Sequence, residues 1–554
     1  MKKIKVHPRR FSNKKQKNII KQFMILILGL TIVQPTIIYT QSESSVSTET
    51  TESATSSESV TSSEQQDERQ ADETMSQLQP EIDLNIDELD DIREVNLVDD
   101  LGAVPNDGKD DSKAFQEALN LATKEPIRLV IPEGEYLSQG EGNLEASGIK
   151  GLQIRGDNAV IKPENPMINP SEYYFMKLFM AEDNVGVEIE GITIDGSLNP
   201  QDLYFTMESS EDIYDLQLQR GIYIENAQRV SVSNTAFRHM YGGYALHLSK
   251  YELVNIQNVK LDDVGGDDIT DSFGMAFYLG GHEGDAVVNI DNVKANGKVS
   301  ERDPSYTAWI GVVVENGSIQ SDKQEDWLLD KNTTVNVTNS TFMDYETTFH
   351  VESMAGNVYF NADNVMSRAK NYFIAAGING EMKSMSQRIN FEMTPWGRNG
   401  IITGLYYSEN EEEKNLNGLN EFIMENSRVR YQNLENVPLI PVATSYGDSI
   451  IAYYNNVTFQ EVPSKLVTNA SGIFTDSQIN LYIESSEDAE SLQEGPFSNS
   501  ANQRVEFLGS TSVNEAGNHA QAQPHNNEVS WFEPTGYQSP SLDGPLEAPI
   551  NNLD

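Results

Sequence analysis

Histidines, tyrosines and glutamates recur at fixed places in a set of short strands, and this pattern is the first candidate for chemistry. In each strand the second and fourth residues are apolar, so period-two alternation should turn them inward and the third and fifth residues outward. These strands are GIYIE (221–225), ALHLS (245–249), AFYLG (276–280), GVVVE (311–315), TFHVE (348–352), FIAAG (373–377) and GLYYS (404–408).

The outward positions of these strands predict a face that could bind and cleave a sugar chain. A sugar chain laid along the face could stack its rings on tyrosines and hydrogen-bond to histidine and glutamate. The third positions are Tyr223, His247, Tyr278, Val313, His350, Ala375 and Tyr406, and the fifth positions include Glu225, Glu315 and Glu352. We expect His247, His350, Glu315 and Glu352 to be catalytic, and Tyr223, Tyr278 and Tyr406 to bind substrate.

Glycoside hydrolysis needs two carboxyl groups, about 5–5.5 Å apart for retention and roughly 6.5–9.5 Å apart for inversion. Glu315 and Glu352 occupy equivalent places in neighbouring strands of the series. A coil spacing of about 4.8 Å would permit the shorter separation. Asp267 or Asp268 against Asp344 or Glu346 could give the longer one.

The loop DDVGGDDITDS (262–272) gathers five aspartates, including Asp267 and Asp268. Crowded carboxylates raise the pKa of one another, which suits a general acid, so both residues are further catalytic candidates. Oxygen ligands of this kind also bind Ca²⁺, although the EF-hand spacing is absent. The alternative is a solvated acidic turn. No cofactor is certain, Ca²⁺ is possible, and no residue is assigned to a metal.

A third source of groups is the segment ERDPSYTAW (301–309), which offers Arg302 and Trp309 for substrate binding. Elimination from a uronic acid would need a base at the C5 proton and a cation at the sugar carboxylate. Arg302 would then gain importance. Hydrolysis and elimination both remain open at this point.

The elements that must position these residues form an internal repeat. A short strand ending in asparagine recurs, as in VSVSN (230–234), VNIQN (254–258) and VNVTN (335–339). Asparagine tolerates the left-handed conformation of a sharp bend, and stacked side-chain amides can hydrogen-bond to each other. The rungs of this ladder would be Asn234, Asn258, Asn292, Asn339, Asn364, Asn426 and Asn456. We predict an all-β parallel solenoid of about ten coils. A β-sandwich is the alternative, but its usual Asn-Gly and Asp-Gly hairpin turns are sparse here.

A solenoid needs a cap over its terminal strand edges. The stretch SKAFQEALNLA (112–122) places Ala114, Phe115, Ala118, Leu119 and Ala122 on one helical face, and Asp110 or Asp111 could be the N-cap. We therefore expect an N-terminal capping α-helix.

The block LVDDLGAVPNDGKDDSKAFQEAL, followed by RLVIPEGEYL, resembles the start of pectate lyase superfamily proteins of the rhamnogalacturonase/epimerase-like group. The resemblance implies a right-handed parallel β-helix in an exported bacterial protein that acts on polysaccharide. The chain lacks the Asn-Thr-Asp and Arg-Ile-Lys elements of polygalacturonases and the Trp-Ile-Asp-His pattern of pectate lyases. No catalytic role is carried over from the family.

The chain ends differ in composition from the repeats. Residues 1–40 hold nine basic residues, no acid and an apolar run at 23–38, which predicts a signal peptide or an N-terminal membrane anchor. Residues 41–94 predict a disordered acidic Ser/Thr-rich spacer, 95–514 the β-helix, and 515–554 an irregular tail. The net charge of −46 disfavours nucleic acid as a partner, and the absence of cysteine excludes thiol chemistry and disulfides.

We therefore expect an extracellular protein, either secreted or associated with the cell surface, whose partner is a polysaccharide rather than a nucleic acid or a nucleotide cofactor. The leading function is a glycoside hydrolase or lyase. A non-catalytic glycan-binding or scaffold protein is the alternative, and a C5-epimerase is a third. Fold alone does not choose among them.

Overall fold

The computed structural model describes one α-helix and the strands of a parallel solenoid. The described residues are 92–138, 144–163, 174–196, 220–241, 244–265, 273–280, 285–297, 308–316, 332–353, 356–377, 382–394, 402–404, 420–431, 441–445, 450–463, 466–468, 471–482, 497–499 and 505–516. Asp267, Asp268, Arg302 and Tyr406 lie outside these residues, as do residues 1–91 and 517–554.

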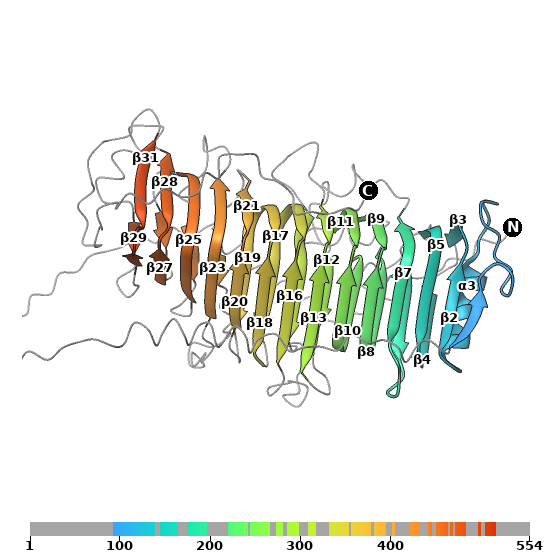
Figure 1. Ribbon diagram of the computed structural model, residues 1–554. Coiled ribbons are helices and arrows are strands. Elements are labelled where there is room, and N and C mark those ends of the chain that lie inside the picture. The colour runs from blue at the N-terminus through green and yellow to red at the C-terminus, as the bar shows by residue number, and fades with distance from the viewer. Residues whose placement is uncertain are drawn as a thin grey trace, which may run out of the picture. The chain divides into compact units, whose positions relative to one another are not determined.

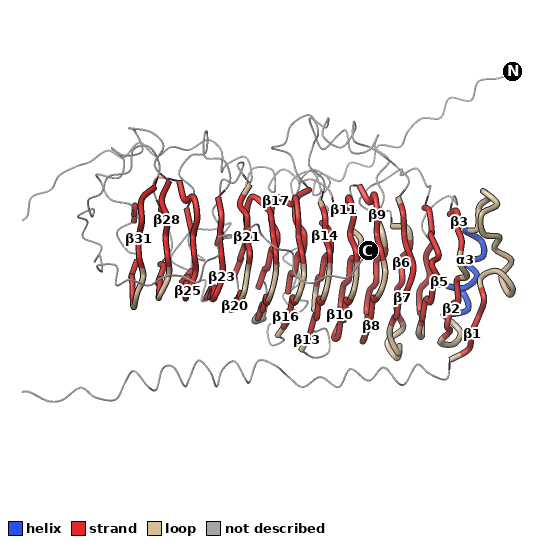
Figure 2. Tube along the Cα trace, turned by 45° about the horizontal axis from the view of Figure 1, so that its top comes forward, coloured by secondary structure: helices blue, strands red, loops and turns tan. Residues whose placement is uncertain are grey.

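The strands form three parallel stacks along the axis of the solenoid (Figures 1 and 2). The first stack runs in pairing order through fourteen strands: β1 (Arg93–Asn96), β2 (Ile127–Ile131), β5 (Leu152–Pro163), β7 (Val187–Asp195), β8 (Ile222–Ser233), β10 (Leu246–Gln257), β13 (Ala286–Asp291), β16 (Thr333–Thr338), β18 (Val358–Asp363), β20 (Met382–Gln387), β23 (Asn420–Tyr431), β25 (Ile450–Pro463), β27 (Ser471–Thr475) and β30 (Val505–Leu508). This stack is longer than the expected ten or so coils.

The second and third stacks complete each coil. The second contains β3 (Gly134–Ser138), β5, β7, β9 (Ala236–Tyr241), β11 (Lys260–Gly265), β14 (Lys294–Asn296), β17 (Thr341–Ser353), β19 (Met366–Gly377), β21 (Asn390–Met393), β23, β25, β28 (Gln478–Tyr482) and β31 (Ser512–Ala516). The third contains β4 (Leu144–Ile149), β6 (Met176–Met180), β8, β10, β12 (Phe273–Tyr278), β15 (Ala308–Asn316), β17, β19, β22 (Ile402–Gly404), β24 (Pro441–Ser445), β26 (Leu466–Thr468) and β29 (Phe497–Asn499). Several long strands, such as β10 and β17, continue round a corner from one stack to the next.

Alternation of apolar and polar residues explains why these segments are strands. Val254 and Ile256 in β10 are fully buried, whereas the residues between and beside them face outward. The inward side chains form one contiguous apolar core inside the coils. Phe349 lies near its middle, with ring centroids 5.2 Å from Phe342, 4.9 Å from Phe360 and 5.5 Å from Tyr372.

The asparagine ladder is confirmed at the corner between the first and second stacks. All seven predicted asparagines have φ between 48° and 55°, the left-handed region that allows a sharp bend. Asn258 donates to Asn234, Asn292 to Asn258, Asn364 to Asn339 and Asn456 to Asn426, at 2.6–3.2 Å. Arg388 and Asp476 take the same left-handed conformation in two coils where sequence reasoning identified no rung.

Helix α3 (Ser112–Ala122) lies at the N-terminal end of the stacks, as expected of a cap (Figure 1). Its buried residues include the five predicted apolar ones, and the Phe115 ring packs edge-on against Tyr136 and Phe175. Asp111 occupies the N-cap position, but its carboxylate accepts from the Val104 N–H. Asp110 instead accepts from the Ser112 N–H, at 3.0 Å. The two aspartates thus share the end of the helix.

An all-β parallel β-helix is therefore observed, with strands from Arg93 to Ala516 and the helix α3 near its N-terminal end, whose capping role stays a prediction. The right hand of its coil stays a prediction. In the part of the chain that the structure describes, no helix is long and apolar enough to cross a membrane.

Candidate functional site

The candidate site lies on the outer face of the third stack, where three rows of side chains run from coil to coil. The aromatic row is Tyr174, Arg220, Tyr244, Phe273, Ile310, Thr347 and Asn371. The histidine row is Lys177, Tyr223, His247, Ala276, Val313, His350 and Ile374. The glutamate row is Phe179, Glu225, Ser249, Tyr278, Glu315 and Glu352.

The observed register corrects three of the predicted strand alignments; in the last of them, Thr403 of β22 pairs with Ile374 of the histidine row, in the place expected of Tyr406. Tyr278 pairs with Ser249 and Glu315, so it belongs to the glutamate row and Ala276 takes its expected place. The alignment is shifted by two residues, and a shift of two keeps Tyr278 outward. Met275 and Phe277 fit the inward positions as well as the second and fourth residues of the predicted strand did. Ala375 points inward and is fully buried. The sequence analysis had placed it outward because the predicted strand began one residue too late.

Small residues at the bend into the third stack allow the aromatic row to form. Gly221, Ala245, Gly274 and Gly311 lie between the aromatic row and the first inward residue of each strand. A Cβ added to Gly221 would lie 2.2 Å from the Ala245 carbonyl oxygen, and one on Gly274 would lie 2.5 Å from that of Gly311. The close backbone approach of successive coils therefore requires glycine at Gly221 and Gly274, and small residues along the whole bend.

His247 sits among four tyrosine rings. The ring centroids of Tyr174, Tyr223, Tyr244 and Tyr278 lie 4.7–5.7 Å from that of His247. The Tyr174 hydroxyl lies 2.5 Å from His247 Nδ1. These rings belong to an apolar cluster that is separate from the core inside the coils. His247 therefore lies beside Tyr223 and Tyr278, two of the tyrosines expected on the same outer face.

Cations accompany this cluster. The Arg220 guanidinium, in a residue that is 5% exposed, stands 5.5 Å from the Tyr174 ring centroid and 5.1 Å from that of Tyr244. Lys177 Nζ lies 5.7 Å from the Tyr174 centroid. All three distances suit cation–π attraction.

Loss of solvent, with a smaller contribution from the nearby Arg220 charge, lowers the pKa of His247 to about 3. The imidazole is therefore neutral near pH 7, and with a neutral ring Tyr174 can donate its proton to Nδ1. A ring that resists protonation so strongly is poorly suited to general acid–base catalysis, which is most effective when the pKa lies near the working pH. His247 is better suited to hydrogen bonding than to the proposed catalytic role.

The second group consists of Glu315, Glu352 and His350. Glu315 in β15 pairs in register with Glu352 in β17, so adjacent coils place the two carboxyl groups side by side. His350 Nε2 lies 2.7 Å from Glu352 Oε1, with 13% and 5% of these side chains exposed. Glu315 is half-buried and Tyr278 precedes it in the glutamate row.

The two groups are separated by the middle of the face. Ala276 and Val313 lie between His247 and His350 in the histidine row and are fully buried although they point away from the core. Three coil steps of about 4.8 Å put His247 and His350 roughly 14 Å apart. The two predicted histidines therefore do not form one catalytic pair. Trp309 lies beside this middle section, with its ring 5.1 Å from that of Phe273.

The predicted acidic partners near β17 are engaged in ion pairs. Asp344 accepts two hydrogen bonds from Arg368, both 2.8 Å long, and Glu346 pairs with Lys370 at 3.0 Å. Their possible partners Asp267 and Asp268 lie outside the described residues, as do Arg302 and Tyr406. Within the described ranges, no group of three or more histidine and carboxylate residues could hold a metal ion.

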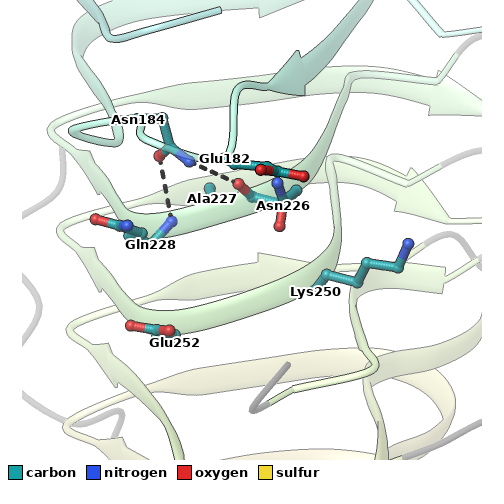
Figure 3. Close-up of a pocket in the computed structure, with 7 residues that line it drawn as sticks. All are labelled: Glu182, Asn184, Asn226, Ala227, Gln228, Lys250 and Glu252. Atoms are coloured by element: carbon teal, nitrogen blue, oxygen red, sulfur yellow. Dashed lines mark hydrogen bonds between the residues drawn. The ribbon is translucent and has the colours of Figure 1, made fainter. Parts of the chain in front are cut away.

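A small polar pocket lies at the corner between the third and first stacks (Figure 3). Asn184 donates to the Asn226 carbonyl oxygen at 2.9 Å and accepts from the Gln228 N–H at 3.3 Å. Lys250 lines the same pocket, but its ammonium group donates to Glu225 of the glutamate row. The polar contacts of this pocket thus hold the corner together.

Sequence reasoning missed Tyr174, Tyr244, Arg220 and Lys177. A usable signal existed for Arg220 and Tyr244, because a large side chain followed by a small residue recurs before the strands as RG (220–221), YA (244–245), FG (273–274) and IG (310–311). The prediction began each strand at the small residue or after it and so overlooked the side chain that precedes it.

Comparisons with known proteins give structural matches only. No family model matches the chain, and no curated protein matches its sequence. The crystal structure of PfbA, a surface adhesin of Streptococcus pneumoniae, matches with 15% identity and a TM-score of 0.47 over 77% of this chain and 91% of that one. A tailspike mutant of E. coli bacteriophage HK620 in complex with pentasaccharide matches with 10% identity and a TM-score of 0.47 over 77% and 78%.

Proposed function

We propose that this protein binds a polysaccharide along the outer face of the third stack and hydrolyses it with Glu315 and Glu352. The observation that carries the proposal is the in-register pairing of these two glutamates on adjacent coils, with His350 hydrogen-bonded to Glu352. A coil spacing of about 4.8 Å is close to the carboxyl separation of retaining glycosidases.

The roles follow from the surroundings of each carboxyl group. Glu352 is held by His350, so its carboxylate has a fixed orientation and would be the nucleophile. Glu315 is more exposed and would donate a proton to the leaving oxygen, then remove one from water. Tyr278, the next residue of the glutamate row, would support a sugar ring beside the cleavage point. Trp309 and Tyr223 would contribute apolar ring faces along the same chain.

A non-catalytic glycan-binding function is the second candidate, and one observation favours it. The ring cluster around His247 supplies aromatic faces with a neutral imidazole, which suits recognition of sugars more than proton transfer. Under this alternative the glutamates would only hydrogen-bond to hydroxyl groups. Elimination and C5-epimerisation would draw on Arg302 and Ca²⁺, neither of which the described residues test.

The proposed setting is outside the cell. The basic and apolar features of residues 1–40 support export, with either a cleaved leader or an N-terminal membrane attachment. Fractionation of cells that express the full chain would test this: we expect the protein in the medium or at the cell surface, and its retention in the cytoplasm would contradict export.

An activity screen tests the proposal. Plant, host and bacterial polysaccharides would be incubated with the protein, with and without Ca²⁺, while reducing ends and the absorbance of unsaturated products are followed. New reducing ends without unsaturated products, lost in Glu352→Gln and Glu315→Gln, would support hydrolysis. Glu421→Gln, the same change on the outer face of the first stack, is the matched control. Unsaturated products would instead support elimination, and retention of a glycan without cleavage would support the binding function.

A further inference from the structure

A second ordered surface lies on the outer face of the first stack, away from the three rows of the candidate site. Asn255, Asn289, Asn336 and Asn361 pair in register on β10, β13, β16 and β18. Their side chains form an unbroken series of hydrogen bonds: Asn289 donates to Asn255 at 2.9 Å, Asn336 to Asn289 at 2.9 Å and Asn361 to Asn336 at 3.0 Å. This row is distinct from the corner ladder, whose asparagines have left-handed backbone conformations.

A second row runs directly beside it. Leu253, Val287, Thr334 and Tyr359 lie two residues before the asparagines on the same four strands and pair with one another in register. All eight side chains of the two rows are partly exposed. We call this pair of rows the amide strip.

The choice of asparagine here is not explained by strand formation. Asparagine is depleted in strands, whereas threonine and valine would suit an outward strand position better. Hydrogen bonds between partly exposed amides contribute only modestly to stability, about 1 kcal/mol each. Four disfavoured residues at one register position therefore indicate a use beyond folding, because natural chains depart from local preference mainly at functional sites.

The chemistry of the strip defines its partner. Its eight side chains carry no charge, although the whole chain has a net charge of −46. Each amide has two N–H donors and an oxygen with two lone pairs, so one donor remains after the ladder bond is made. The adjacent row offers aliphatic and aromatic surface. Hydroxyl groups fit the amides, and the C–H faces of sugar rings fit the apolar row.

The spacing of the strip restricts the partner further. The amides repeat about every 4.8 Å along the stack, close to the length that one sugar unit adds to an extended polysaccharide. An uncharged surface neither attracts nor repels a charged chain strongly, but it leaves the charged groups of such a chain without partners. We propose that the amide strip binds a neutral, extended polysaccharide laid parallel to the stack, as an attachment site separate from the glutamates.

Affinity electrophoresis of the full chain tests this attachment site. The gels would contain hydroxyethyl cellulose, mixed-linkage β-glucan or galactomannan, and a carboxymethyl cellulose gel would provide the charged comparison. Glu352→Gln would be the background, so that the polymers stay intact and the outcome is independent of cleavage. We expect at least one neutral polymer to retard migration, and carboxymethyl cellulose to retard it less.

Two variants of different kinds locate the binding. Tyr359→Ala removes a ring face without touching the amide bonds, and Asn289→Asp places a charge in the middle of the ladder. Each should weaken retardation about tenfold. Asn296→Asp makes the same amide-to-acid change in the same coil but on the second stack, and should have no effect. Melting temperatures would establish that the variants are folded.

Three results would overturn the attachment site. The first is no retardation in any neutral gel, and the second is retardation that Tyr359→Ala and Asn289→Asp leave unchanged. The third is self-association that Tyr359→Ala abolishes without any effect of the neutral polymers, because the strip would then be a contact between two copies of the chain.

Discussion

The neutral state of His247 makes a quantitative prediction about stability at acidic pH. In the unfolded chain a histidine has a pKa near 6.5, whereas solvent exclusion and the Arg220 charge lower the pKa of folded His247 to about 3. As the pH falls below about 6.5, His247 binds a proton in the unfolded chain but stays unprotonated in the folded one. The free energy of unfolding therefore decreases with falling pH, and the decrease stops once the pH is below about 3.

The size of this effect follows from the two pKa values. At pH 5 the unfolded imidazole is almost fully protonated and the folded one is not, which costs about 2 kcal/mol of stability relative to pH 8. The full difference below pH 3 would approach about 5 kcal/mol, at 1.36 kcal/mol for each pKa unit. The sign follows from the two causes, because burial and the Arg220 charge both disfavour the protonated ring.

Comparison of the wild-type protein with His247→Gln isolates this titration from that of the many carboxylates. Urea unfolding would be followed for both proteins at pH 8, 7, 6 and 5. We expect the wild-type protein to lose about 2 kcal/mol more than the variant between pH 8 and pH 5. Val288→Ala, a core change in β13, controls for the effect of destabilisation by itself. If the difference in unfolding free energy between wild type and His247→Gln is the same at every pH, the neutral imidazole is refuted. If the wild-type protein becomes more stable relative to the variant at pH 5, His247 is again a candidate for acid–base catalysis.

Three further changes test the fold. Phe349→Ala removes a fully buried ring that touches three other rings, so it should cost about 3–5 kcal/mol in urea unfolding, and a loss below 1 kcal/mol would contradict the described core. Gly221→Ala should lower the melting temperature by several degrees because the new Cβ would clash with the Ala245 carbonyl, and an unchanged melting temperature would mean that the coils are further apart there. Asn339→Ala should cost about 1–2 kcal/mol, because alanine at φ 49° is strained and the hydrogen bond from Asn364 is lost; Asn339→Gly should recover part of that cost, and equal losses in the two variants would argue against backbone strain.

The repeat was predictable because its signals are local. A sharp corner in every coil needs a residue that tolerates positive φ, and asparagine fills that need in seven coils, so the ladder was visible in the sequence. The helix was visible for a similar reason, because the period of Ala114, Phe115, Ala118 and Leu119 differs from that of every strand. Arg388 was missed because nothing in an arginine side chain indicates a left-handed backbone, and Asp476 because only asparagine was sought at the corner, although aspartate also tolerates this conformation.

The candidate site was only partly predictable, because its rows depend on register. An alternation of period two determines which residues face outward, but a shift by two leaves that pattern unchanged, and this is why Tyr278 was placed in the wrong row. At Ala375 the predicted alignment was wrong by one residue, which reversed the predicted direction of the side chain. A run of small and apolar residues gave no clear alternation there. The pairing of Glu315 with Glu352 was anticipated because both strands have unambiguous apolar positions.

The burial of Ala276 and Val313, in the middle of the candidate site, could not be predicted from the sequences of the strands. Ala276 and Val313 point outward and are nevertheless fully buried, in an apolar cluster whose members Phe273, Trp309 and Ile310 precede the segments that were aligned. The pKa of His247 depends on its burial and on Arg220, which precedes the strands that were aligned. Contacts between residues 73 positions apart, such as Tyr174 and His247, are set by the coil and not by local sequence.

The proposed hydrolysis by Glu315 and Glu352 is tested most sharply by the release of reducing ends by the wild-type protein and by Glu352→Gln. On a polysaccharide that the wild-type protein cleaves, we expect Glu352→Gln to retain binding and to lose at least a hundredfold in the rate of reducing-end release, about 3 kcal/mol of transition-state stabilisation. A variant that cleaves the same substrate at the wild-type rate would contradict the assignment of these glutamates as the catalytic pair.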